Sequence, residues 1–566
     1  MTSPSYPTTS VPIRTQVRDA VERAWRRAIE AGELPAVEDG LPVVEIERPA
    51  RPDHGDFAAS LAMKLARPYR RAPLDIARVL AEAITADVAD AAVDTPIASV
   101  EVAPPGFLNL RLTDRALEET IGAILGDPAA WGRVPMVRPR TVNVEFVSAN
   151  PTGPLTIGNA RGAFIGDLLS RVLEAGGQQV TREYYFNDQG GQIPNLGASV
   201  VAIRRGEPIP EDGYHGGYVG PLAADVPEEL WAEATAAGAD TNGIVGHWAA
   251  LRVRAGIEAS LERLGVRFDV WTTEASLHDG GWVERAIDRL RAGGHVFEQD
   301  GAIWFRSTAF GDDKDRVIIR ADGRPTYFAA DIGYVTEKFS RGFDHLIYVW
   351  GADHHGTVAR VRNAAQAMGY DQDAVQMLLY SWVRFIRDGV EISMSKRAGE
   401  FITLDELLEE VGVDAARWFF ASRAATTGID FDIELAKTQS AENPVYYVQY
   451  AHARIASILR KAADTGLDPA DGVGGLLAGG PEAALARAVV RFPEVVEDAA
   501  RTEETHGVTA YATELATQFH AFYRDARVVD SNEPARSAGR LALVSAARIT
   551  LANALGLLGI SAPESM

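Results

Sequence analysis

Two short segments carry residue types that could bind a phosphate group. The first, residues 142–174, has a strand pattern over 142–147, then a loop with Pro and Gly, then a helix pattern entered through Gly158 and Asn159. A turn of this kind aims unpaired backbone N–H groups and the positive end of a helix dipole at one place, which suits a phosphate. Many α/β proteins turn this way without a ligand, so this segment alone leaves a purely structural interpretation open.

The second segment lies far downstream, after the strand-like residues 382–386, and reads Ser393-Met394-Ser395-Lys396-Arg397. It places two adjacent cations and two hydroxyl groups on a predicted loop. Such a loop can close on a polyphosphate and neutralise the charge that builds on a leaving group. Together the two segments predict an enzyme that works on a polyphosphate.

Alternating strand and helix patterns predict the element that positions both segments. They favour a Rossmann-like α/β domain over residues 131–434, whose parallel sheet binds ligands at the carboxyl ends of its strands, where the strand order switches. Residues from about 189 to 273 break the alternation and are interpreted as an insertion. The predicted strands of this domain cover residues 142–147, 179–186, 303–306, 316–320, 346–350 and 377–386.

The flanking regions have different patterns, so we predict a multidomain protein. Residues 1–130 favour an α+β domain, with strand patterns at 43–47 and 99–112 and helix patterns at 14–31, 57–66 and 72–85. Residues 435–566 favour an all-α helical bundle. Its predicted helices cover residues 444–463, 481–502, 508–528 and 534–558.

Composition limits the possible functions. The chain has 566 residues, no cysteine and a formal net charge of −22, so catalytic thiols and thiolate metal sites are excluded and broad, nonspecific nucleic-acid binding is disfavoured. Local basic patches could still meet RNA. The apolar residues 541–560 are interrupted by Arg548 and Asn553, which favours a buried amphipathic helix over a membrane span.

Six stretches of the sequence resemble the arginyl-tRNA synthetases, a family of class I aminoacyl-tRNA synthetases. They are VEFVSANPTGPLTIGNARGA, TREYYFNDQGGQI, YFAADIGY, YVWGADHHG, MSKRAGEFITLDELLEEVG and ENPVYYVQYAHARI. The resemblance runs from about residue 45 to the C-terminus. The first signature motif of the family usually has a histidine at each end, where this sequence has Thr156 and Asn159, and the second usually opens with lysine, where it has Ser393.

The resemblance implies a ligase that activates L-arginine with ATP and transfers arginine to tRNA(Arg). It assigns catalysis to Thr156, Asn159, Ser395 and Lys396. ATP binding is assigned to Ala149, Asn150, Pro151, Gly153, Pro154, Gly158, Met394 and Lys396. Mg²⁺ is implied by ATP, held mostly by phosphates and water, with no metal site of the protein itself.

A guanidinium is best held by a carboxylate in paired hydrogen bonds. The resemblance assigns arginine binding to Glu145, Ser148, Asn150, Tyr327, Asp331 and His354. Some of these residues could instead be helix caps or members of buried salt bridges. Asp353, His354 and His355 could suggest a metal, but neighbouring residues on a helix diverge by about 100°, so positioning of substrate is favoured.

The two flanking domains are expected to contact the tRNA. The N-terminal domain resembles one that meets the outer corner of the tRNA, and the bundle resembles an anticodon-binding domain. Tyr447, Tyr450 and Arg454, with Tyr446, Gln449 and His452 nearby, would line one end of the bundle, where aromatic rings could stack on unpaired bases. Buried core tyrosines remain the alternative.

Other functions remain open. An inactive paralogue that binds tRNA or regulates would explain the missing histidines, whereas Asn150, Asp331 and Lys396 favour an active enzyme. A ligase that passes arginine to a small molecule would be expected to lack the bundle. The interpretation that we favour is a cytoplasmic, monomeric arginine–tRNA ligase that does not use a membrane.

Overall fold

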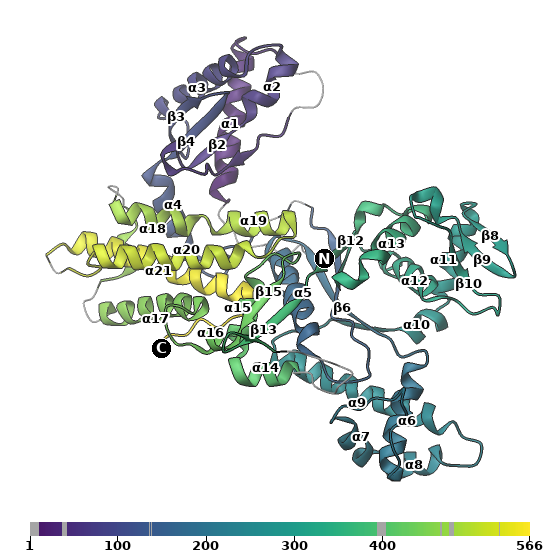
Figure 1. Cartoon of the computed structure of the whole chain (residues 1–566). Helices are drawn as coiled ribbons and strands as arrows, with labels where there is room; N and C mark the ends of the chain where they lie inside the picture. Colours follow the sequence, from purple (N-terminus) through teal and green to yellow (C-terminus); the bar gives the residue numbers. More distant parts are fainter. Residues whose placement is uncertain are drawn as a thin grey trace, which may run out of the picture.

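The computed structural model describes residues 11–36, 42–134, 136, 138–392, 403–463, 467–474, 480–530 and 532–566. An N-terminal α+β domain, a central parallel sheet with its insertion, and a C-terminal helical bundle are visible in Figure 1. The multidomain fold predicted from the sequence is therefore confirmed.

The N-terminal domain is a four-stranded antiparallel sheet in the order β1-β2-β4-β3, packed with three helices. The prediction of a helix from residue 57 is wrong at its start. Phe57 and Ala59 are buried in strand β2, with the two-residue alternation of a half-buried strand, and the helix begins only at Leu61. The elements are α1 (Ile13–Glu30), β1 (Ile46–Glu47), η1 (Pro52–His54), β2 (Phe57–Ala59), α2 (Leu61–Tyr69), α3 (Pro73–Ala89), β3 (Ile97–Ala103) and β4 (Phe107–Leu112).

The central sheet is parallel throughout and has the order β12-β11-β5-β6-β7. The chain moves outward in one direction from β5 to β6 and β7, and in the other direction through β11 and β12. The strand order therefore switches between β5 and β11, where ligands bind in open α/β sheets. The strands are β5 (Thr141–Phe146), β6 (Gln179–Phe186), β7 (Val270–Thr273), β11 (His345–Gly351) and β12 (Val375–Tyr380).

The two faces of β5 differ in chemistry. Val142, Val144 and Phe146 alternate with Asn143 and Glu145, and all five are buried. Helix α5 (Ile157–Ala175) packs on the apolar face. It comes so close that a Cβ at Gly166 would lie 2.1 Å from the Phe146 ring, so a glycine is required there. Helix α12 (Tyr327–Ser340) bonds to the polar face.

The insertion is helical, and it ends earlier than predicted. Val270–Thr273 pairs in parallel with β6 as an edge strand of the central sheet, so the insertion predicted over residues 189–273 stops before residue 270. A strand of four residues after a long helical segment gives little sequence signal. The insertion contains α6 (Gln192–Arg205), α7 (Val219–Asp225), α8 (Glu228–Ala234) and α9 (Thr241–Arg263).

Residues 377–386 do not form the single strand that was predicted. The chain leaves the central sheet after Tyr380, and β13 (Val383–Arg387) pairs with β14 (Val390–Glu391) and β15 (Ile429–Asp432) in a separate sheet. Only two residues separate β12 from β13, so the sequence shows one continuous apolar segment, which predicted a single strand. The remaining elements of this region are α10 (Glu274–Asp279), α11 (Trp282–Ala292), β8 (Val296–Gln299), β9 (Ala302–Phe305), η2 (Ser307–Phe310), β10 (Arg316–Ile319), η3 (Ala352–His354), α13 (His355–Ala367), η4 (Gln372–Ala374), α14 (Leu404–Val411), α15 (Val413–Ala421) and α16 (Ile433–Lys437).

The C-terminal region is the predicted bundle, with one helix divided in two at Arg491. Its helices are α17 (Pro444–Ala463), η5 (Pro469–Gly472), α18 (Gly480–Val490), α19 (Phe492–Thr502), α20 (Gly507–Asp525) and α21 (Pro534–Leu558). Helix α4 (Asp114–Gly126) follows the N-terminal domain and packs on α18 and α21. By length and composition α21 could cross a membrane, but 67% of its most apolar window is buried inside the protein, as in the core helix of a bundle.

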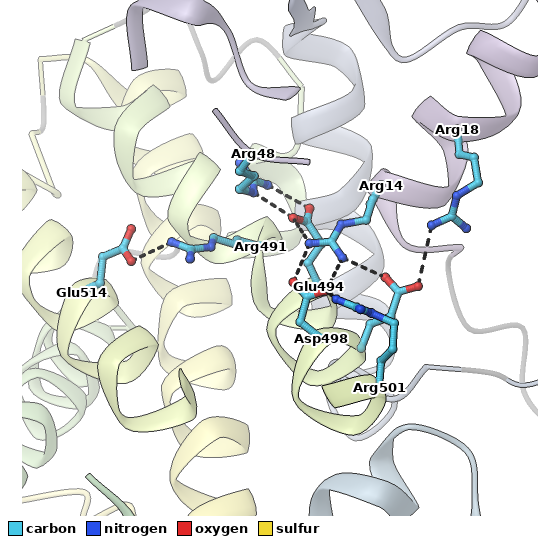
Figure 2. Close-up of polar contacts among 9 residues, drawn as sticks. Arg14, Arg18, Arg48, Arg491, Glu494, Asp498, Arg501 and Glu514 are labelled. Carbon is cyan, nitrogen blue, oxygen red and sulfur yellow. Dashed lines mark hydrogen bonds and ion pairs between the residues drawn. The ribbon is translucent and has the colours of Figure 1, made fainter. Parts of the chain in front are cut away.

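Ion pairs join the N-terminal domain to the bundle (Figure 2). The carboxylate of Glu494 on α19 accepts two hydrogen bonds of 2.8 Å from Arg48, and its side chain is 1% exposed. Arg14 on α1 donates two further bonds of 2.8 Å to Asp498. Because charges removed from water are stable only with close partners, these contacts fix one orientation of the two domains.

Candidate active site

A cavity of about 1220 Å³ lies at the carboxyl ends of β5, β6 and β11, at the switch in strand order. Pro151 is buried, and neither Pro151 nor Gly158 lines it. Met394, Ser395 and Lys396 lie outside the described residues. Of the residues predicted from the sequence, those that line the cavity are Glu145, Ser148, Ala149, Asn150, Gly153, Pro154, Thr156, Asn159, Tyr327, Asp331 and His354.

Directly after strand β5, two residues that line the cavity have a left-handed backbone conformation. Val147 has φ 68° and Ser148 has φ 41°, which is unfavourable for residues with a side chain, most of all a β-branched one. Strain of this kind is kept where surrounding contacts hold it, commonly at functional sites. Here the Ser148 hydroxyl donates to Glu145 Oε1 at 3.1 Å and accepts from the Tyr185 backbone N–H at 3.1 Å.

Glu145 forms a buried salt bridge. Lys338 Nζ on α12 donates to Glu145 Oε2 at 2.6 Å, and the two side chains are 0% and 5% exposed. The ammonium also lies 4.2 Å and 4.0 Å from the ring centroids of Tyr334 and Tyr348, where the π faces favour a cation. The charge of Glu145 is therefore largely neutralised inside the protein, although its carboxylate still lines the cavity.

Asp331, one helical turn before Tyr334, is the carboxylate without such a partner. Burial raises the pKa of Asp331 to about 7, and the negative charges of Glu145 and Glu274 add to the increase. No hydrogen bond or salt bridge to its side chain is found among the described residues. A cationic ligand in the cavity would supply the missing partner and favour the ionised form of Asp331.

Glu183, a buried carboxylate on β6, organises the polar face of the sheet. Glu183 accepts from Arg341 at 2.6 Å and from the Tyr334 hydroxyl at 2.6 Å. Desolvation opposes the charge of Glu183, but the positive charges of Lys338 and Arg341 outweigh it and lower the pKa of Glu183. This network fixes α12 against the sheet and so fixes the position of Asp331.

Sequence reasoning missed several cavity residues on known elements. Tyr185, at the end of the predicted second strand, lines the cavity; burial raises the pKa of its hydroxyl, and the negative charge of Glu274 adds to the increase. Tyr334 lines the cavity seven residues after Tyr327. Positions 327, 331, 334 and 338 share one helical face, and this spacing was the signal that could have found Tyr334 and Lys338.

Thr156 and Asn159 pair with each other at the start of α5. Asn159 Oδ1 accepts from the Thr156 backbone N–H at 3.2 Å and from its hydroxyl at 2.9 Å. This reciprocal cap satisfies orphan groups of the first helical turn. Both residues line the cavity as predicted, and neither can supply a positive charge.

The chain that follows the second signature motif lies against the first. Thr403 forms an antiparallel bridge with Thr156, and the Leu404 N–H donates to the Leu155 carbonyl at 2.9 Å. The motif itself, residues 393–397, lies outside the described residues. These contacts place Thr403 and Leu404, which follow the second motif in the sequence, next to the start of α5.

A loop of the insertion forms another wall of the cavity, which the sequence did not suggest. Glu211, Gly213, Tyr214, His215, Gly216 and Tyr218 all line it. The Tyr218 hydroxyl donates to the Thr152 carbonyl in the loop before α5. The insertion therefore completes the site.

His354 lines the cavity just after β11. Its ring is 5.5 Å from that of Trp350, and its Nε2 is 3.8 Å from Asp353 Oδ2. In the part of the chain that the structure describes, no group of three or more His, Asp and Glu side chains is arranged to hold a metal ion.

The aromatic cluster of the bundle is partly on the surface. Tyr450 is 39% exposed, and Arg454 lies over the rings of Tyr450 and Tyr523 at 5.7 Å and 4.5 Å. The Tyr447 ring packs 4.9 Å from that of His520. The three predicted tRNA-binding residues therefore lie together.

Gln449 and His452 do not belong to this surface, in contrast to the prediction. Both are buried, and they bond to the C-terminal tail: Gln449 donates to the Ser561 carbonyl at 3.0 Å, and His452 Nδ1 lies 2.8 Å from the Pro563 carbonyl. Their positions on α17 place them on a different side of the helix from Tyr446, Tyr450 and Arg454.

Three family models match the chain. The model of the arginyl-tRNA synthetase N-terminal domain matches residues 13–112. The catalytic-domain model of class I (R) tRNA synthetases matches residues 123–206 and 246–432. The DALR anticodon-binding domain matches residues 448–566.

Relatives match over nearly the whole chain. The arginine–tRNA ligase of Geobacter sp. (strain M21) is 44% identical, covering 98% of this chain and 100% of the relative. That of Geobacillus thermodenitrificans is 44% identical, covering 97% and 99%. The solved arginyl-tRNA synthetase of Thermus thermophilus superposes with a TM-score of 0.75 at 25% identity, covering 97% of this chain and 100% of that one. The chain therefore belongs to the arginyl-tRNA synthetase family.

Proposed function

We propose that the protein is an arginine–tRNA ligase, which activates L-arginine with ATP and transfers arginine to the 3′ end of tRNA(Arg). The observation that carries the proposal is Asp331, a half-buried carboxylate without a cationic partner among the described residues, in the cavity at the switch point of the sheet. A neutral or acidic amino acid would leave that charge uncompensated. The family membership supports the same reaction.

Arginine binding is assigned to the predicted set. Asp331 and the exposed Tyr327 would hold the guanidinium, with Glu145 near enough to add negative potential. Ser148 and Asn150, on the loop after β5, would bond to the other polar groups of the amino acid, and His354 would do so from the segment after β11. The fixed position of α12 gives these groups the geometry that a planar guanidinium requires.

ATP is assigned to the loop between β5 and α5, through Ala149, Asn150, Gly153 and Pro154, which line the cavity; the predicted Pro151 and Gly158 do not line it. Met394 and Lys396 of the second motif would close on it, and Thr156, Asn159, Ser395 and Lys396 would act on the reacting phosphate. Mg²⁺ would be held mainly by phosphate oxygens and water. The exposed carboxylate of Asp353 at the cavity could accept bonds from that water.

The chemistry needs little covalent help. The arginine carboxylate forms a bond to the α-phosphorus of ATP while the bond to pyrophosphate breaks; a terminal ribose hydroxyl of the tRNA then attacks the arginyl carbonyl, and AMP leaves. Positioning and charge stabilisation dominate such transfers. The fixed α12 and the capped α5 supply the positioning.

The tRNA is proposed to contact the N-terminal domain at residues 1–130 and the bundle at residues 435–566, which flank the catalytic domain at 131–434 in the sequence. Tyr447, Tyr450 and Arg454 would stack on anticodon bases or pair with phosphates. We infer that the protein acts as a monomer. We infer a cytoplasmic enzyme that does not use a membrane.

The role of Asp331 is tested with Asp331→Asn in steady-state tRNA charging. Loss of a charge-assisted bond should raise the KM for arginine about 10- to 100-fold and leave the KM for ATP within about twofold. Asp322→Asn is the matched control, because Asp322 lies on the turn after β10, where it bonds to Arg324. Equal increases in the KM values for arginine and for ATP would show that Asp331 does not bind arginine specifically.

A further inference from the structure

The lining of the cavity is poor in positive charge. Its described lining residues include four carboxylates, those of Glu145, Glu211, Asp331 and Asp353, but no Lys or Arg. Only His215 and His354 among them can carry a positive charge. A polyphosphate needs charge-assisted donors, and a protonated imidazole is one.

The two histidines are not equivalent. His354 lies 3.8 Å from the carboxylate of Asp353 and beside the Trp350 ring, on the wall formed by β11. Its imidazole therefore already has a carboxylate as a neighbour. His215 is exposed, on the insertion loop that lies against the first signature motif.

This loop is held on α6 at one end. The Tyr214 backbone N–H donates to Ser199 Oγ at 2.8 Å, and the Ser199 hydroxyl donates to the Asn195 carbonyl at 2.9 Å. Ser199 is fully buried. A Cβ at Gly213 would lie 2.7 Å from Ser199 Oγ, so the chain passes too close to α6 for another residue there. Tyr214, which precedes His215, is therefore held in place by the buried hydroxyl of Ser199.

At its other end, the loop is attached to the first motif. Tyr218 donates to the Thr152 carbonyl, and a Cβ at Gly153 would lie 3.0 Å from the Tyr218 hydroxyl. His215 thus belongs to a short segment fixed at Tyr214 and at Tyr218. That segment lies beside the loop that leads into α5, where Thr156 and Asn159 are bonded to each other.

We propose that His215 binds the polyphosphate of ATP, as a donor supplied by the insertion in place of the charge that Thr156 and Asn159 cannot carry. The proposal rests on the proposed function, because it assigns a further substrate contact to the same cavity. It also gives the insertion loop a role in ATP binding in addition to closing the cavity.

The experiment compares wild-type protein with His215→Ala, His215→Gln and the control His247→Ala, which changes an exposed histidine on α9 of the same insertion. Loss of one charge-assisted bond should lower kcat/KM for ATP about 10- to 100-fold in His215→Ala. The KM values for arginine and tRNA should stay within about twofold. Because an amide can still donate, His215→Gln should recover part of the loss.

Calorimetric titration with a non-hydrolysable ATP analogue measures the same contact without turnover. Weaker binding in His215→Ala and unchanged binding in His247→Ala are expected. Wild-type binding of the analogue by both His215 variants, or a loss confined to the KM for tRNA, would overturn the inference. Failure of the proposed function would be seen separately, as a wild-type protein that charges no tRNA with arginine while the titration still reports on His215.

Discussion

Lys338 Nζ lies 2.6 Å from Glu145 Oε2, and both side chains are buried. The pair crosses from α12 to the central strand of the sheet, one turn of the helix beyond Tyr334. It neutralises one of the two carboxylates in the arginine site and leaves the other, Asp331, for a ligand. The site should therefore select a cationic ligand because Asp331 has no cation of the protein beside it among the described residues, whereas Glu145 is already paired with Lys338.

Arginine binding should depend on pH through Asp331. The pKa of this carboxyl is about 7 in the free protein, and a bound guanidinium favours the ionised form, so its pKa must be lower in the complex. Below about pH 7 binding must displace a proton, and the affinity should fall by up to about tenfold per pH unit. Calorimetric titration of arginine from about pH 5.5 to pH 8 checks this, and affinity that is independent of pH would contradict it.

Asp331→Asn should stabilise the free protein at neutral and alkaline pH. The pKa of Asp331 is raised in the folded state, so ionisation opposes folding; the penalty is absent below the ordinary pKa of 3.8 and is fully developed above about 7. The free energy of unfolding should rise by about 1–3 kcal/mol at about pH 8. The gain should vanish near about pH 4, and a loss of stability at pH 8 would show that the carboxylate has a hidden partner.

Lys338→Met should destabilise the catalytic domain. It leaves Glu145 buried without its cation, which costs about 3–5 kcal/mol. The double variant Glu145→Gln/Lys338→Met removes both charges and should recover much of the loss. Urea unfolding followed by tryptophan fluorescence measures both; additive losses in the double variant would show that the two residues do not act as a pair.

Glu494→Gln should loosen the N-terminal domain. The change removes the carboxylate that accepts two bonds from Arg48 and should cost about 1–3 kcal/mol, because the guanidinium loses a buried partner. Glu514→Gln is the control, since Glu514 and Arg491 are both partly exposed and such pairs contribute less than about 1 kcal/mol (Figure 2).

Protease cleavage of the N-terminal domain and the KM for tRNA are the measurements for this pair of variants. In Glu494→Gln, the rate of cleavage and the KM for tRNA should both increase, whereas the KM values for arginine and ATP should not change. Equal behaviour of the two variants would mean that the cluster at Glu494 does not set the domain orientation.

Sequence patterns predicted the parts of the site that depend on local spacing. The strand at residues 142–147, the turn and the following helix were predicted from their spacing. Because ligands bind at the carboxyl ends of parallel strands, the residues between Glu145 and Asn159 were expected at that edge of the sheet, and they lie there. Tyr327 and Asp331 were found on the start of a helix. The family resemblance supplied their assignment to arginine.

Contacts between distant segments could not be predicted in this way. Lys338 and Glu145 are 193 residues apart, and the helical spacing that places Lys338 on the face of Asp331 does not show that it pairs with a carboxylate on β5. Tyr218 and Thr152 meet only because the insertion folds back over the first motif. The division of residues 377–386 depends on which sheet each half joins, and a continuous apolar run does not show this.

The most direct test of the account is charging of total tRNA by the purified protein with ATP, Mg²⁺ and each standard amino acid in turn, beside a Lys396→Ala control. We predict charging with arginine alone, strongly reduced in the control, which would show that Thr156 and Asn159 suffice where relatives of this family usually have histidines. A protein that binds tRNA but charges it with no amino acid would contradict the account and favour a tRNA-binding paralogue.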